Sequence, residues 1–465
     1  MPAKYAIHHT TAKPRFRPIG KLGIVDWRED CSGCHNCVKR SCVYRLYRDE
    51  ADSLRDEVGY LDYIYQCKGC LSCVQNCTKN ILTRVVNPEY RRLGDGYYTP
   101  DLVLSTWYQA ETGKIPVSGA GYGGPFSGPG FDSMWTDMSE IVRPTRDGIH
   151  GREYISTSVD IGRKLPHLSF ADGQLNVDPP PLVETPLPVI FDRIPEHWNR
   201  GAVLAAIATA ASEIGTLAVL GEADIRENEG SVRGQVVPFL TTPPAPTSPS
   251  GRSAPFVMIP DGPDAMAVQA ALKRDPSAKI VAIRVPAVPT AAGRVADLAR
   301  DGADVILLAF DSHGMEQGTA QPRHARDVLR DTHATLVRQG IRDEVTLIAS
   351  GGIAAAEHVV KAIICGADLV AIDVPLMLAL ECRLCGECRR GQPCPIALEE
   401  IDIGFGVRRI VNLMAAWHSQ LLEMLGAMGI REIRRLRGET GRCMFFEDLE
   451  RDSFGRLFGK RRSGS

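Results

Sequence analysis

The sequence lacks the features that would place the protein in a membrane, in a secretory route or on an anionic polymer. It contains no run of about 18 apolar residues, so no transmembrane helix is expected. Its first residues, Met-Pro-Ala-Lys-Tyr-Ala-Ile-His-His, hold no apolar segment of the kind that secretory signals need. The net charge is only −2, which gives no argument for nucleic acid or an anionic membrane as a partner. These absences favour a cytoplasmic protein.

Chain length and cysteine are what the sequence has in abundance. Its 465 residues exceed one ordinary core, so two or three domains are expected. Apolar residues make up 44 % and charged residues 24 %, which is typical of a globular protein. Fourteen cysteines in a long chain without a secretory signal indicate metal ligation in a reducing compartment, not disulfides.

Four of these cysteines form a cluster late in the chain. Cys382, Cys385 and Cys388 stand at C-x2-C-x2-C spacing, and Cys394 directly precedes a proline. Thiolates at this spacing can converge on one iron–sulfur cluster, whereas apolar packing requires no such rhythm. Zinc is the stronger competitor for an isolated quartet. The same cysteine chemistry occurs twice more in this chain, which favours iron–sulfur clusters.

Eight further cysteines form two runs near the N-terminus. Their spacings, C-x2-C-x2-C-x4-C and C-x2-C-x2-C-x3-C, are the pattern of a two-cluster ferredoxin, with two zinc ribbons as the alternative. The first run has an extra residue before its last cysteine, and neither run ends in Cys-Pro; that proline shapes a turn and ligates nothing. Because the fourth cysteine of each run ligates the other cluster, the expected ligand sets are Cys31, Cys34, Cys37 and Cys77, and Cys67, Cys70, Cys73 and Cys42.

From residue 187 onward, short apolar runs alternate with helical patterns. Eight such units fit a (β/α)8 barrel; a doubly wound open sheet is the alternative, because a sequence does not show closure. The expected strands are Leu187–Phe191, Thr216–Leu220, Gln235–Leu240, Phe256–Ile259, Lys279–Val285, Asp304–Phe310, Val345–Ala349 and Asp368–Ile372. The expected helices include Ala202–Ile214, Asp264–Arg274, Ala291–Arg300, Ala325–Gln339 and Ala355–Ile364.

In such a barrel the chemistry lies on the loops that follow the strands. The loop after the seventh expected strand is glycine-rich and opens a helix, so its amides can bind a phosphate, although a tight glycine turn is the plain alternative. The loop after the sixth strand brings titratable groups to the same mouth. Arg284 lies inside an apolar strand, where an arginine needs an anionic partner. The candidate catalytic residues are Arg284, His313 and Glu316, and the candidate cofactor-binding residues are Ser350, Gly351, Gly352 and Asp373.

Several stretches resemble the FMN-binding domain of glutamate synthases. Three of them come in the family's order: Ser350-Gly-Gly-Ile, Gly366-Ala-Asp-Leu-Val and the cysteine cluster ending in Cys394-Pro. Asp331-Thr-His-Ala-Thr-Leu resembles the family's Glu-Thr-His-Gln-Thr-Leu helix, and Ala427–Gly441 is similar to its closing helical segment. The likeness covers roughly residues 140–445, and the N-terminal part looks like the ferredoxin module of archaeal-type members. It implies an FMN-bearing barrel that passes electrons between flavin and clusters, with 2-oxoglutarate chemistry at the flavin.

The chain departs from that family pattern around the substrate pocket. The start Met-Pro-Ala implies that the N-terminal nucleophilic cysteine and glutaminase domain are absent, so ammonia would come from solution or another subunit. The family's Gly-Ala-Met-Ser loop reads Asp192-Arg-Ile-Pro195 here, and its strand lysine reads Arg284, a bulky fork in place of a point charge. Cys385 is an addition to the family's three cysteines and implies a four-iron cluster in place of a three-iron one.

Two interpretations follow from these observations. The first is an iron–sulfur flavoprotein oxidoreductase with three [4Fe-4S] clusters and FMN, which aminates a 2-oxo acid such as 2-oxoglutarate. The second is an electron-transfer or scaffold subunit of a larger redox complex, with a degenerate barrel site. The expected partners are other redox or amidotransferase-like subunits and a one-electron carrier such as ferredoxin. The expected domains are a two-cluster ferredoxin-like module (1–90), a connector wrapping the barrel (91–182), the barrel with its cysteine cluster (183–400) and C-terminal helices with a tail (401–465).

Overall fold

The fold was obtained as a computed structural model of the whole chain. It describes residues 6–16, 19–26, 34, 36, 40–41, 43, 60–63, 70–80, 82–115, 130–136, 155–228, 230, 235–241, 254–274, 280–453 and 455–458. Four cysteines of the two N-terminal runs lie outside these residues: Cys31, Cys37, Cys42 and Cys67.

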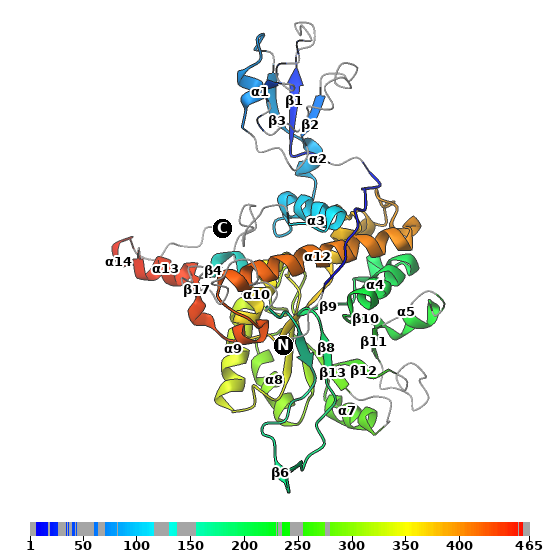
Figure 1. The fold of residues 1–465 in the computed structure, drawn as a ribbon, viewed down its shortest axis with the longest axis vertical. Coiled ribbons are helices and arrows are strands. Elements are labelled where there is room, and N and C mark those ends of the chain that lie inside the picture. The colour runs from blue at the N-terminus through cyan, green and yellow to red at the C-terminus, as the bar shows by residue number, and fades with distance from the viewer. Residues whose placement is uncertain are drawn as a thin grey trace.

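Eight parallel strands close into a barrel, which confirms the expected (β/α)8 barrel, while the N-terminal ferredoxin-like module stays a prediction (Figure 1). Closure is direct, because the last strand pairs with the first through Val370 and Val189, and this excludes the doubly wound open sheet. Each strand coincides with one of the expected apolar runs. The strands are β9 (Val189–Phe191), β10 (Ala218–Gly221), β11 (Val236–Phe239), β12 (Phe256–Pro260), β13 (Ile280–Pro286), β14 (Val305–Ala309), β15 (Thr346–Ser350) and β16 (Leu369–Ile372).

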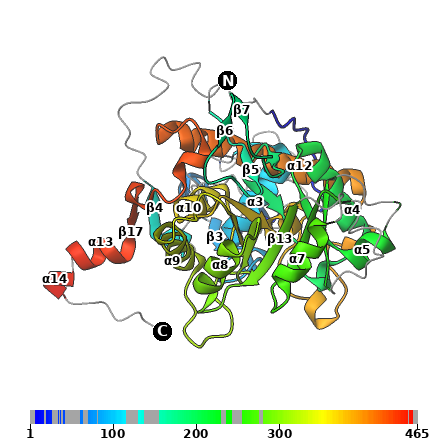
Figure 2. The ribbon, with the colours of Figure 1, turned by 90° about the horizontal axis from the view of Figure 1, so that it is seen from below.

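Helices surround these strands, as Figure 2 shows for the outer ring. The helical patterns are amphipathic because one face must pack on the barrel while the other meets water. In α8, for example, Val295 and Leu298 are buried and Arg294 is partly exposed. The helices of the ring are α4 (Gly201–Ile214), α5 (Glu222–Glu227), α7 (Ala265–Lys273), α8 (Ala291–Arg300), α9 (Ala325–Arg338), α10 (Ala356–Ile364) and α11 (Val374–Ala379).

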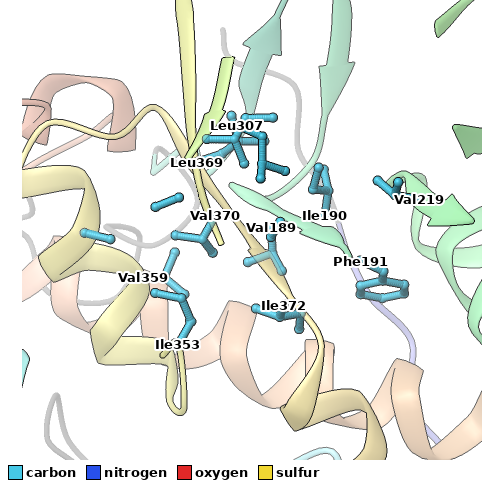
Figure 3. Packing of buried hydrophobic residues seen from close by; sticks show 14 of the residues in the cluster. Val189, Ile190, Phe191, Val219, Leu307, Ile353, Val359, Leu369, Val370 and Ile372 are labelled. Atoms are coloured by element: carbon cyan, nitrogen blue, oxygen red, sulfur yellow. The ribbon is translucent and has the colours of Figure 1, made fainter. Parts of the chain in front are cut away.

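The barrel core is apolar on both faces of the sheet. All three residues of β9, including Ile190 and Phe191, are fully buried, as expected for a parallel strand covered by helices outside and side chains inside. Figure 3 shows Val370 and Ile372 of β16 beside Val189 of β9 in this core. Charged residues inside this sheet therefore need an internal partner.

A long helix and the chain's N-terminal segment lie across the barrel. Helix α12 (Ile403–Ala427) packs on both α4 and α3 (Pro100–Thr112), as Figure 1 shows. Helix α3 was not expected, although its sequence has a proline at its first position and Gly113 at its end with φ +68°, which are ordinary start and stop signals. The N-terminal sheet comprises β1 (Leu22–Asp26), β2 (Tyr60–Tyr63) and β3 (Leu82–Val86), with α1 (Ser72–Gln75) and α2 (Pro88–Arg91) beside it.

The closing segment Ala427–Gly441 differs from the helical segment that the resemblance implied. Helix α12 ends at Ala427, and Gly429 takes φ +72°, the left-handed conformation that stops helices. The segment then makes only short 3-10 turns. Among the described residues, no helix is both long and apolar enough to cross a membrane. The remaining elements are β4 (Met134–Thr136), β5 (Val159–Ile161), β6 (Phe170–Ala171), β7 (Gln174–Leu175), β8 (Val183–Thr185), β17 (Cys443–Phe445), α13 (Phe446–Ser453) and α14 (Gly455–Phe458).

Candidate functional site

Three barrel strands bring an ion pair together at the mouth of the barrel. Nη1 of Arg284, in β13, donates to both carboxylate oxygens of Asp192, at 2.7 and 2.9 Å, and Asp192 directly follows β9. The hydroxyl of Ser350, the last residue of β15, donates to the same carboxylate. Burial by itself raises the pKa of Asp192, but the charge and hydrogen bonds of Arg284 outweigh burial and lower that pKa below its ordinary value. The anionic partner expected for Arg284 is therefore supplied by the chain itself.

A second carboxyl group, that of Asp373, lies close to this ion pair. Asp373 follows β16 and caps α11, because its side chain accepts a hydrogen bond of 2.6 Å from the N–H of Val374. Burial, and then the nearby charge of Asp192, raise the pKa of Asp373 to about 6. The hydroxyl of Tyr98 is buried without a hydrogen-bond partner among the described residues, and after burial the charge of Asp373 contributes most to raising the pKa of Tyr98. The mouth thus holds a carboxyl group that can exchange a proton near neutral pH.

The glycine loop after β15 has the geometry of an anion cradle. Gly351 and Gly352 take φ values of +100° and +72°. A Cβ atom on them would meet the carbonyl oxygen of Asp311 at 2.3 Å and Cα of Gly314 at 2.5 Å, so only glycine fits. The amides of Gly351, Gly352 and Ile353 are buried and donate to no acceptor in the part of the chain that the structure describes. Buried N–H groups without acceptors are rare, and an anion is the ligand that such a loop takes.

His324 adds another donor beside this loop. Its Nδ1 accepts a hydrogen bond of 3.1 Å from the N–H of Arg326, which leaves the ring proton on Nε2. That Nε2 is buried without a partner among the described residues, and a Cβ atom on Gly314 would lie 3.0 Å from it. Burial lowers the pKa of His324 to about 3, so the ring is neutral. The sequence analysis missed this residue because a single histidine before a helix carries no motif.

A turn from the connector covers the mouth and holds His313. The carboxylate of Asp95 accepts from the N–H groups of Tyr97 and Tyr98, and its other oxygen lies 2.9 Å from Nε2 of His313. The ring of Tyr97 stacks on His313 with centroids 5.4 Å apart. The Tyr97 hydroxyl donates to the carbonyl of Gly352, which ties the turn to the glycine loop. None of these connector residues was expected at the site, because nothing in their spacing points to the barrel.

Glu316 has a different partner again. Its carboxylate accepts from Arg323 at 2.7 Å, and Arg323 also pairs with Asp331 of α9. Burial acts to raise the pKa of Glu316, but the hydrogen bonds from Arg323 lower it overall. The three candidate catalytic residues therefore lie in three separate pairs, with Asp192, Asp95 and Arg323.

The late cysteines line one cavity of about 70 Å³. The backbone around them is unusual, because Glu381, Leu384 and Ala397 all take positive φ values although they are not glycine. Cys382 is buried, and burial raises the pKa of its thiol to about 12. Such turns let a short loop point several side chains inward. The thiols that share the cavity are those of Cys382, Cys385, Cys388 and Cys394.

An arginine from the N-terminal segment holds both ends of this cysteine loop. Arg15 donates through its N–H and its Nε to the carboxylate of Glu381, at 2.8 and 2.9 Å, and through Nη2 to the carbonyl of Ile396. Arg409 of α12 is buried and donates to the carbonyls of Ala379 and Ala12, which joins α11 to the same segment. Burial lowers the pKa of Arg409 to about 10. These long-range contacts, unseen in the sequence, fix the loop on the barrel.

The cysteine loop also touches the turn over the mouth. The N–H of Gly94 donates to the carbonyl of Arg383 at 2.9 Å, and Asp95 lines the cysteine cavity.

In the N-terminal runs, Sγ of Cys34 lies 3.9 Å from Oγ1 of Thr78, the residue after Cys77. This places the first run beside the end of the second. The assignment of ligands to two clusters stays a prediction.

One further group of possible metal ligands is structural. Asp132, Glu357 and His358 offer ligand atoms within 4.8 Å of one another. However, Nδ1 of His358 accepts from the N–H of Ala354 at 3.2 Å, and its Nε2 bonds Asp132 at 3.1 Å. With both ring nitrogens engaged, His358 pins the segment around Asp132 to α10.

Comparison with known proteins places this geometry in context. Residues 253–431 match the conserved region of glutamate synthases. The archaeal glutamate synthase [NADPH] of Archaeoglobus fulgidus is 27 % identical, with 96 % of this chain and 98 % of that protein covered. The archaeal-type glutamate synthase [NADPH] of Dehalococcoides mccartyi is also 27 % identical, with 89 % of this chain and 93 % of that protein covered.

Among solved structures, the chain is similar to a soluble mutant of the membrane-associated (S)-mandelate dehydrogenase of Pseudomonas putida. The TM-score is 0.42 at 13 % identity, with 68 % of this chain and 88 % of that chain covered. At this level the likeness adds nothing to the strand pairing, which by itself defines the barrel.

Proposed function

We propose that this chain, a glutamate synthase-like protein, is an iron–sulfur flavoprotein oxidoreductase that moves electrons between a flavin at the barrel mouth and iron–sulfur clusters. Its reaction is the amination of a 2-oxo acid such as 2-oxoglutarate. One observation carries the proposal: four cysteines line one cavity, and their loop is hydrogen-bonded, through Gly94 and Arg383, to the turn at the mouth. The same turn reaches the glycine loop through Tyr97 and Gly352.

The cysteine cavity fits an iron–sulfur cluster better than zinc. Four thiolates close around a single zinc ion at about 2.3 Å, which leaves no cavity among them. The cavity of about 70 Å³ that the four cysteines line together with neighbouring residues instead has room for a group of several atoms. The closeness of Cys34 to Thr78 supports the interleaved ligand sets of the N-terminal runs, in which Cys34 and Cys77 serve one cluster.

The residues of the mouth fit FMN. Its phosphate would meet the free amides of Gly351 and Gly352, and the unpartnered Nε2–H of His324 lies beside them. Ser350 was expected in the same role, but its hydroxyl is engaged by Asp192. When bound, FMN couples two-electron chemistry at the substrate to one-electron transfer through clusters.

The chain's own residues supply charge and protons at this mouth. Asp373, whose pKa burial raises to about 6, can give or take a proton near neutral pH. Arg284 is held in place by Asp192, so its position does not depend on a ligand. Tyr97 ties the turn that carries the Asp95–His313 pair to the glycine loop at this mouth.

An electron-transfer or scaffold subunit is the second candidate function. Its support is the Arg284–Asp192 pair, which neutralises the charge that a substrate anion would otherwise meet on β13. An absorbance spectrum of the anaerobically purified protein, with flavin extraction, separates the two. Bound flavin that the amino acid reduces, or that is reoxidised after reduction by the 2-oxo acid together with ammonia, supports the enzyme. Full iron and sulfide without flavin, and no uptake of added FMN, would leave the subunit interpretation in its place.

A further inference from the structure

A second arginine stands at the mouth, directly after the residue that neutralises the first. Arg193 follows Asp192, and its backbone N–H donates to that carboxylate at 2.7 Å. Its guanidinium lies over the ring of Phe239, with Cζ 4.4 Å from the ring centroid. Phe239 is the last residue of β11. A Cβ atom on Gly221, the last residue of β10, would lie 4.0 Å from Nη2 of Arg193. The guanidinium therefore lies over the carboxyl ends of β10 and β11, where barrel chemistry takes place.

The guanidinium of Arg193 has no carboxylate within ion-pair distance in the described ranges. Three acidic groups are near enough to influence it: Asp192, Asp224 and Glu196. Asp192 is engaged by Arg284 and Ser350, and Asp224 accepts a hydrogen bond of 2.6 Å from the side chain of Asn199.

The environment of Arg193 makes this lack of a partner costly. Burial is the main influence and lowers the pKa of Arg193, and the positive charge of Arg284 lowers it further. A partly buried cation is ordinarily matched by an anion. The ring of Phe239 offers a cation–π contact, which stabilises the guanidinium but leaves its five N–H donors without an acceptor among the described residues.

We propose that Arg193 binds a carboxylate of the substrate, with its guanidinium held in place beforehand by the ring of Phe239. This rests on the proposed function and adds the residue that selects an anionic substrate. A planar fork suits two parallel hydrogen bonds to a carboxylate, and its placement on a ring reduces the entropy lost on binding. The two neighbouring residues therefore have different effects on the arginines of the mouth. Asp192 forms an ion pair with Arg284, and the guanidinium of Arg193 stays available for the ligand.

The test is isothermal titration calorimetry of the purified holoprotein with 2-oxoglutarate, and with dimethyl 2-oxoglutarate, an analogue that keeps the ketone but whose carboxylates are neutral esters. Arg193→Gln is expected to weaken binding of 2-oxoglutarate by roughly tenfold or more, because a charge-assisted hydrogen-bond pair is lost. Arg193→Lys should fall between, since it keeps the charge without the fork. Phe239→Leu should weaken binding less than Arg193→Gln, because the guanidinium stays but is no longer held on a ring.

Arg200→Gln is the matched control. Arg200 belongs to the same segment but is exposed and donates to the carbonyl of Asn199. The affinity of the Arg200→Gln protein for 2-oxoglutarate should therefore equal that of the wild type. Melting temperature and iron content of each variant report whether the fold is kept. Unchanged affinity in a folded, flavin-loaded Arg193→Gln protein overturns the inference, as does wild-type holoprotein that binds 2-oxoglutarate no better than dimethyl 2-oxoglutarate. A wild-type protein without flavin would instead overturn the proposed function.

Discussion

Asp192 and Arg284 form a buried ion pair across the barrel mouth, with Nη1 of Arg284 at 2.7 and 2.9 Å from the two carboxylate oxygens of Asp192. Asp192 lies in the loop after β9 and Arg284 lies in β13, 92 positions later in the chain. Asp192 is 2 % exposed, so its carboxylate cannot rely on water if Arg284 is removed, whereas the Arg284 side chain keeps 23 % exposure. The pair therefore has a measurable role in stability as well as in the chemistry of the site.

Removing one partner of this pair should destabilise the protein. Asp192→Asn leaves the Arg284 charge unmatched in the barrel, and we expect a loss of about 2–4 kcal/mol in the free energy of unfolding. Ser350→Ala removes only one hydrogen bond to the same carboxylate and should cost about 1 kcal/mol. Denaturant unfolding of both variants measures the difference. Equal effects of the two substitutions would show that the ion pair adds nothing to the hydrogen bond.

The raised pKa of Asp373 predicts a stability that depends on pH in a defined direction. Burial makes its ionised form costly, so the folded state holds the proton up to about pH 6 while the unfolded state releases it near the ordinary aspartate pKa of 3.8. Stability from this group is complete at low pH and falls as the pH rises through that window. Asp373→Asn, which never ionises, should therefore be more stable than the wild type by about 1–3 kcal/mol at pH 8.

The advantage of Asp373→Asn should be smaller at pH 5 than at pH 8. Unfolding measured at the two pH values, with the wild type in parallel, checks this. An advantage that does not change with pH would mean that Asp373 titrates alike in the folded and unfolded states.

The glycine loop should be required for flavin retention. Gly352→Asp places a carboxylate beside the free amides and a Cβ atom 2.5 Å from Cα of Gly314, so flavin should be lost while iron stays. Gly340→Asp is a matched control, because Gly340 also has a positive φ, +71°, but no atom within 4 Å of its Cβ position. Flavin extraction and iron analysis measure the two effects. Retention of flavin by Gly352→Asp would exclude this loop as the phosphate site.

The contacts of Arg15 predict that the N-terminal segment stabilises the late cysteine cluster. Arg15→Ala frees Glu381 and Ile396 at the two ends of the loop, and we expect loss of up to about four iron atoms per chain on mild chelation. Arg408→Ala is the control, since Arg408 is exposed on α12. Iron release followed by absorbance compares the two variants. Equal rates of release would show that the loop holds its shape without Arg15.

The eight barrel strands were predictable because each is an apolar run buried on both faces, which is typical of a parallel sheet that helices cover. Closure was not, because it depends on the pairing of β16 with β9, far apart in sequence. Helix α3 could have been found from Pro100 and Gly113. The role of Arg193 could not have been found in this way, because Arg193 is left without a carboxylate partner only when Asp192 pairs with Arg284 on another strand.

The cysteine site was recognisable from spacing, but its support was not. The C-x2-C-x2-C rhythm constrains where the sulfur atoms can point, whereas the Arg15–Glu381 contact joins residues 366 positions apart. The same holds for His313, whose partner Asp95 is supplied by the connector. Residue types and their spacing can therefore be recognised from the sequence, whereas the distant residues that hold them in place are known only from the fold.

We propose that the four late cysteines hold an iron–sulfur cluster beside the barrel, separate from the two clusters of the N-terminal runs. Its most direct test is iron and acid-labile sulfide analysis, with electron paramagnetic resonance, of the anaerobically purified wild type, Cys388→Ser and Cys365→Ala. Cys365 is a buried thiol outside the cysteine cavity, which makes it a suitable control. We expect about twelve iron atoms in the wild type and in Cys365→Ala, and about eight in Cys388→Ser. The electron paramagnetic resonance signals of the N-terminal clusters should remain in Cys388→Ser. Near-stoichiometric zinc with little sulfide in the wild type, or equal iron in Cys388→Ser and Cys365→Ala, would contradict it.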